Sequence, residues 1–75
     1  MSLKGELAKE IQLLEEEIKE LEVKRIRSMA ALMESIISKQ DVGEDEPRFF
    51  RTYTAEIEDK RAKLAKLKKK LDRIS

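Results

Sequence analysis

The sequence contains no cysteine, histidine or tryptophan among its 75 residues, and it has only two glycines, one proline and 4% aromatic residues. Without cysteine no disulfide forms, and without cysteine or histidine the chain lacks the ligands of common zinc and iron–sulfur sites. A chain of this length holds at most one small domain and buries only about 60% of its unfolded surface. Because such a fold is marginal alone, oligomerisation is the stabilising device that remains.

Catalysis, metal binding and membrane insertion find no support in the residues present. No apolar run approaches the roughly 18–20 residues of a membrane span, and the N-terminus lacks the apolar core of a signal peptide. We therefore expect an intracellular, cytoplasmic protein without a membrane segment. No serine stands in a glycine-rich elbow, so we predict no catalytic residue, no cofactor and no enzymatic activity. Four acidic residues stand close together at Asp41, Glu44, Asp45 and Glu46. Their spacing is not that of a calcium-binding loop, so we expect a solvated turn without a bound metal.

The residues that break helices gather in one place, where Gly43 and Pro47 stand among acidic residues. Glycine suits the position just past a helix end, and proline suits the first helical turn. The flanking segments show no alternation of polar and apolar residues, so we predict no strand. The expected fold is one all-α unit over residues 1–75, with a helix over about 3–40, a turn over about 41–46 and a helix over about 46–74.

Apolar residues in both predicted helices recur at alternating spacings of three and four, the heptad pattern of coiled coils. The first helix carries the run Leu7, Ile11, Leu14, Ile18 and Leu21. The run is interrupted at Arg25 and resumes at Met29, which predicts a local unwinding of the supercoil there. The second helix carries Phe50, Tyr53, Ile57, Lys60, Leu64, Leu67, Leu71 and Ile74, with Lys60 as the polar member.

A short connection between helices makes them antiparallel neighbours, so the pattern predicts an antiparallel two-helix coiled-coil hairpin. The register that we expect pairs residues whose numbers sum to about 89, such as Leu21 with Leu67. The second helix then ends opposite Leu14. Leu7 and Ile11 are therefore expected to extend beyond it as an uncovered apolar end.

Charge is segregated along the chain, although 17 basic and 16 acidic residues leave a net charge of only +1. Residues 6–22 hold seven glutamates and two lysines, whereas residues 60–73 hold eight basic residues and one aspartate. An antiparallel hairpin places these two blocks side by side, while a parallel pair of identical chains would align like charges. The charge pattern therefore favours the hairpin.

The expected hairpin leaves apolar residues uncovered at its free end and around its turn, which predicts association. A homodimer that forms a four-helix bundle is the simplest closed assembly. The function predicted from this surface is a non-enzymatic coiled-coil protein–protein interaction or oligomerisation module, as an adaptor, scaffold or regulatory subunit. The surface could also take a helix of a different protein partner. The residues of the expected interface are Leu7, Ile11, Ile26, Met29, Met33, Ile37, Phe49, Phe50 and Tyr53.

Two alternative functions stay open. A basic stripe at helical spacing, suited to phosphates of a nucleic acid, comprises Lys66, Lys69, Lys70 and Arg73. No aromatic residue interleaves with it, and the near-neutral net charge favours a solvated helix face over a nucleic-acid site. The chain could also be the coiled-coil arm of a larger protein.

Overall fold

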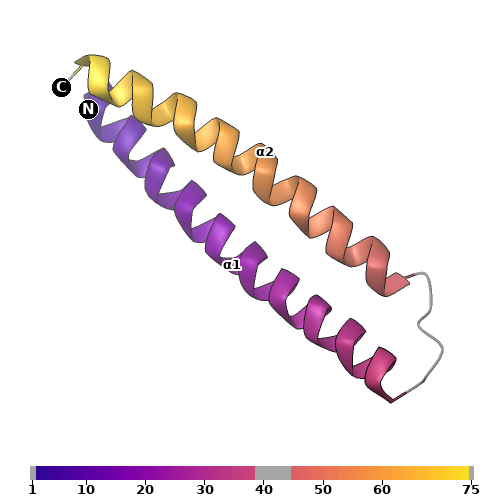
Figure 1. Cartoon of the computed structure of the whole chain (residues 1–75). Helices are drawn as coiled ribbons and strands as arrows, with labels where there is room; N and C mark the ends of the chain where they lie inside the picture. Colours follow the sequence, from indigo (N-terminus) through magenta and orange to yellow (C-terminus); the bar gives the residue numbers. More distant parts are fainter. Residues whose placement is uncertain (1, 39–44, 75) are drawn as a thin grey trace.

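The computed structural model describes residues 2–38 and 45–74 of the chain, and within them it contains two helices and no strand. Helix α1 spans Leu3–Ile37 and helix α2 spans Asp45–Ile74. The helices pack antiparallel into a rod about 55 Å long and 14 Å across, with both ends of the chain at the same end of the rod (Figure 1). The predicted all-α hairpin is confirmed, while most of the predicted turn lies outside the described residues.

The ends of α1 are satisfied by serine side chains. Ser2 caps the N-terminus, where its side-chain oxygen accepts a hydrogen bond from the Gly5 N–H at 3.1 Å, and Glu6 adds a negative charge to the first turn. The Ser2 oxygen and the Glu6 carboxylate both stabilise the N-terminus of α1, because each interacts favourably with the positive end of the helix dipole. At the other end the Ser38 N–H and hydroxyl each donate to the Glu34 carbonyl at 2.9 Å. These caps explain why α1 begins and ends where it does.

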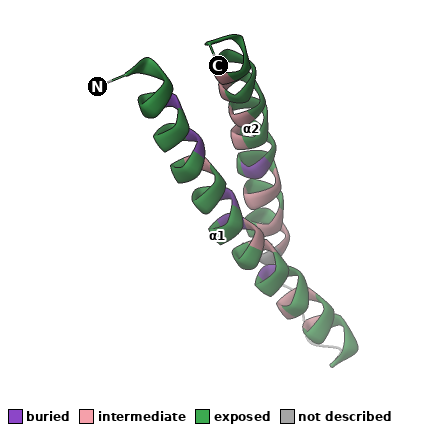
Figure 2. Cartoon of the chain, turned by 90° about the vertical axis from the view of Figure 1, so that its left-hand side faces the viewer, coloured by how far each residue is buried: buried purple, intermediate pink, exposed green. Residues whose placement is uncertain are grey.

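A single row of α1 residues faces α2, and its buried members lie on the side of α1 turned toward that helix (Figure 2). The most buried side chain of the described residues is Ile57 on α2, which is 1% exposed and packs against Ile18 and Leu21. Tyr53 and Leu64 pack against this cluster on either side. The core is therefore a narrow apolar line between two helices.

The expected register is wrong, because α2 lies about 11–14 residues closer to the N-terminus of α1, a shift of about 16–21 Å. Ile57 contacts Ile18 and Leu21, whereas the expected register would place it opposite Leu32. Leu7 and Ile11 are consequently covered by the hairpin, each only 8% exposed, instead of extending beyond it. This register is favoured physically because it removes those two large apolar side chains from water.

The expected interruption of the row at Arg25 is also wrong. The row that faces α2 continues at spacings of three and four beyond Leu21, through Arg25, Ser28, Leu32 and Ser35, and all four are buried or half-buried. The sequence pattern continues the row through Met29, Leu32 and Ile36. Leu32 is half-buried in the row toward α2, whereas Met29 and Ile36 are 47% and 66% exposed on another face. In the half of α1 near the turn, the face toward α2 therefore becomes partly polar.

Ile57→Ala should lower the free energy of unfolding by about 2–5 kcal/mol, because the change removes buried methyl groups from the narrow core. Leu13→Ala is a matched control, since Leu13 is 53% exposed and its truncation should cost much less. Urea denaturation followed by far-UV circular dichroism, at one protein concentration, measures both losses. Equal losses in the two variants would contradict the observed core.

Candidate interaction surface on α1

An apolar surface runs along the half of α1 near the turn, on a face that α2 does not cover. Its large side chains are 45–78% exposed, and Ala30 lies exposed among them. Contiguous exposed apolar surface of this kind marks interaction sites. We name it the α1 stripe and define it as Val23, Ile26, Met29, Ala30, Met33, Ile36 and Ile37.

The stripe is uncovered because of helical phase. Ile26 and Met29 each stand one residue after a member of the row that faces α2, and one residue turns an α-helix by about 100°. Side chains pointed that far from the row lie beyond the reach of α2. The half of α1 near the turn thus presents a partly polar face to its partner helix and an apolar face to solvent.

The other half of α1 shows the reverse arrangement. Its row toward α2 is apolar, and the face that continues the α1 stripe is exposed and polar or charged at Gln12, Glu15 and Lys19. A long amphipathic helix that served α2 alone would keep its apolar residues on one face throughout. The switch of face indicates that α1 has two packing surfaces, of which α2 occupies one.

The aromatic residues at the start of α2 do not join the stripe. Phe50 and Tyr53 are half-buried, and Tyr53 packs against the core. Phe49 is 50% exposed and lines, with Tyr53, a shallow hollow of about 290 Å³ whose α1 residues include Arg27 and Ala31. By helical phase Arg27 and Ala31 lie on the flank of α1 opposite Met29. The structure therefore separates the methionine and aromatic residues that the sequence grouped together.

The residues of the expected interface fall into three groups. Leu7 and Ile11 are buried between the helices, so the reason for placing them in an interface no longer holds. Phe50 and Tyr53 are half-buried by α1. The exposed members are Ile26, Met29, Met33, Ile37 and Phe49. For these five, a role in association stays a prediction.

Sequence reasoning missed Val23, which is 45% exposed. Helical phase was the signal that could have found it, since Val23 shares one broad face with Ile26 and Met33. Ile36 is 66% exposed. The sequence groups it with the methionine and aromatic residues as a groove for another protein's helix, although the expected register also pairs it with Tyr53.

Ion pairs join the acidic part of α1 to the basic part of α2. Lys60 Nζ lies 2.7 Å from the Glu17 carboxylate, and Arg61 pairs with Glu22. The two charge blocks therefore lie side by side, as the segregation of charge predicted. The hydrogen bond from Lys60 to Glu17 raises the pKa of Lys60 above its ordinary value, with a smaller contribution from Glu56. Solvent-exposed ion pairs contribute little to the free energy of unfolding, so their main effect here is to favour the antiparallel arrangement of the two helices.

Glu17→Gln should lower the pKa of Lys60, measured by NMR titration of its side chain, while the control Glu20→Gln leaves it unchanged. A folded-state pKa above the unfolded value means that the pair stabilises the fold fully below the unfolded pKa. That contribution is lost as the pH rises through the folded pKa. The stability difference between wild type and Glu17→Gln should accordingly shrink above pH ~10.4, the ordinary lysine pKa. An unchanged Lys60 pKa in Glu17→Gln would contradict the observed pair.

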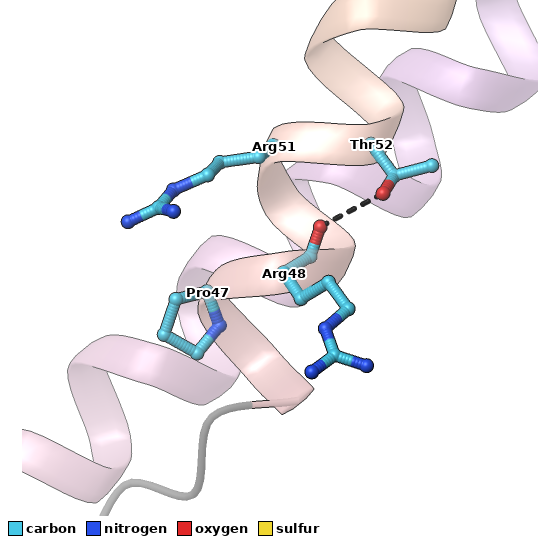
Figure 3. Close-up of a pocket in the computed structure, with 4 residues that line it drawn as sticks. All are labelled: Pro47, Arg48, Arg51 and Thr52. Atoms are coloured by element: carbon cyan, nitrogen blue, oxygen red, sulfur yellow. Dashed lines mark hydrogen bonds between the residues drawn. The ribbon is translucent and has the colours of Figure 1, made fainter.

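The described residues offer no enclosed site for catalysis or metal binding. The hollow in Figure 3, of about 440 Å³, is an open depression on α2 lined by Pro47, Arg48, Arg51 and Thr52. The Thr52 hydroxyl donates to the Arg48 carbonyl at 2.9 Å, and the two guanidinium groups point in different directions (Figure 3). No three acidic side chains of the described residues cluster as metal ligands. The expected acidic turn lies outside what the structure describes, apart from the backbone of Asp45 and Glu46.

The basic stripe is exposed along the last turns of α2, with its four side chains at Lys66, Lys69, Lys70 and Arg73. The structure places no aromatic side chain among them, and nucleic-acid binding stays a prediction. Neither described helix is long and apolar enough to cross a membrane.

Comparison with protein-family models, with curated protein sequences and with solved structures gives no match. The function is therefore argued from the surfaces of the hairpin itself.

Proposed function

We propose that this hairpin is a non-enzymatic interaction module, which uses the α1 stripe to pack against a helix of a second chain and most simply associates as a homodimer. The observation that carries the proposal is the second apolar face of α1, with six large side chains 45–78% exposed. An adaptor, a scaffold and a regulatory subunit are roles compatible with such a module.

The dimensions of the stripe suit a helix as its partner. From Val23 to Ile37 the stripe extends about 21 Å at 1.5 Å per residue. The residues along its centre recur at spacings of three and four: Val23, Ile26, Ala30, Met33 and Ile37. Side chains at those spacings form the ridges that pack into the grooves of a facing helix. Two hairpins joined in this way form an assembly of four helices in which the two α1 helices are in contact.

The small core of the single hairpin supports the same conclusion. Among the described residues, the buried large apolar side chains are Leu7, Ile11, Ile18, Leu21 and Ile57, and of these only Ile57 is fully buried. A chain of this size without disulfides or metals gains the stability that it lacks by burying further apolar surface against another chain. Six of the ten exposed large apolar side chains of the described residues lie in the α1 stripe, which makes it the surface suited to that purpose.

Met33→Glu should abolish association while leaving the helical signal intact, because a charge buried in the contact is costly but an exposed glutamate suits a helix. Wild type should show about twice the single-chain mass of 8.8 kDa in sedimentation equilibrium at micromolar concentration, and the variant one chain mass. Leu13→Glu is the control, since Leu13 is exposed but lies outside the stripe. A monomeric wild type, or equal effects of both variants, would overturn the proposal.

A further inference from the structure

We propose that two copies pack α1 against α1 in antiparallel orientation, with the two-fold axis of the dimer passing beside Ala30. This inference rests on the proposed function and assigns the geometry and the partner of the α1 stripe. Three features of the stripe carry it: the symmetry of its spacing, the size of its central residue and the charges along its edge.

The spacing of apolar residues along the centre of the stripe is almost the same on both sides of Ala30. Val23 and Ile37 each lie seven residues away, and Ile26 and Met33 lie four and three residues away. In a two-fold contact, a residue before the axis meets a residue after the axis on the second copy, and the contact occurs twice. When a second copy is turned around Ala30, Val23 therefore meets Ile37 and Ile26 meets Met33. Met29 and Ile36 lie outside this symmetric line, because their mirrored positions are Ala31 and Lys24.

The smallest residue of the stripe stands where the two helices would cross. Helix axes pack 8–10 Å apart, and the separation depends on the side chains at the contact. With a methyl group at Ala30, the two helix backbones approach closely at the axis. The longer side chains of Ile26 and Met33 then fill the space on either side of it.

Charges along one edge of the stripe select the antiparallel orientation. Arg27 lies three residues before Ala30 and Glu34 lies four residues after it, two helical turns apart and therefore on the same edge. An antiparallel pair brings Arg27 beside Glu34 of the second copy, and does so twice. A parallel two-fold pair would instead place the two copies of Arg27 on opposite edges of the contact, so Arg27 and Glu34 would not meet each other there. Both residues are exposed, and neither forms an ion pair with another residue that the structure describes.

Disulfide trapping tests this axis directly, because the natural chain contains no cysteine. At the axis, Cα atoms of helices packed 8–10 Å apart come within about 3.5–5.5 Å, which overlaps the range a disulfide spans. Ala30→Cys should therefore cross-link to itself under mild oxidation and run as a dimer on a non-reducing gel. Val23→Cys should not, because in antiparallel helices its two copies lie about 21 Å apart. Ala62→Cys, on the exposed face of α2, is the control for random collision.

Charge reversal provides a second test that needs no cross-link. Arg27→Glu should weaken the dimer by about three- to tenfold, because each dimer loses two exposed ion pairs. Glu34→Arg should weaken it similarly, and the double variant should restore affinity close to wild type. Sedimentation equilibrium measures all three dissociation constants.

The outcomes separate this inference from the proposed function. A monomeric wild type overturns both. A dimeric wild type in which Ala30→Cys cross-links no faster than Ala62→Cys overturns the axis alone. Self-cross-linking of both Ala30→Cys and Val23→Cys shows a parallel dimer and overturns the orientation. Additive losses in the double charge variant, in place of restored affinity, contradict the pairing of Arg27 with Glu34.

Discussion

The packing of Ile57 against Ile18 and Leu21 fixes where α2 lies along α1, and the exposed surface of the molecule depends on that position. Ile57 is the most buried described side chain, and it stands at the middle of the contact between the helices. With α2 held there, Leu7 and Ile11 are covered at the free end. At the other end α1 continues past the level at which α2 begins (Figure 1). Most of the exposed large apolar side chains of the described residues therefore lie near the turn, although Leu3 and Ile74 are exposed at the free end.

Helical phase then decides which residues of α1 remain free. A single neighbouring helix covers one side of α1, and the 100° step between residues separates Ser28, which faces α2, from Met29, which does not. The cost of this arrangement is a weaker contact between the helices near the turn, where Arg25 and Ser28 replace apolar residues. The same helix presents its apolar residues on a second face, where six large side chains are 45–78% exposed.

Electrostatics acts at two levels in this molecule. Within the hairpin, the pairs Lys60–Glu17 and Arg61–Glu22 align the acidic and basic blocks, so the near-zero net charge reflects neighbouring opposite charges. At the α1 stripe, Arg27 and Glu34 remain outside these pairs. In the proposed dimer they perform between chains the role that Lys60 and Glu17 perform within one. In both cases exposed charges select an orientation, while apolar burial supplies the stability.

Periodicity, helix breakers and charge blocks are local or summed properties of the chain, so the two helices and their antiparallel pairing could be predicted without a structure. The sequence by itself did not determine the register. A heptad row slides along a second heptad row and still meets apolar residues at spacings of three and four, so several registers satisfy the pattern. Only the tertiary packing decided that Ile57 contacts Ile18 and Leu21. That choice moved Leu7 and Ile11 into the core and left the α1 stripe as the surface for a second chain.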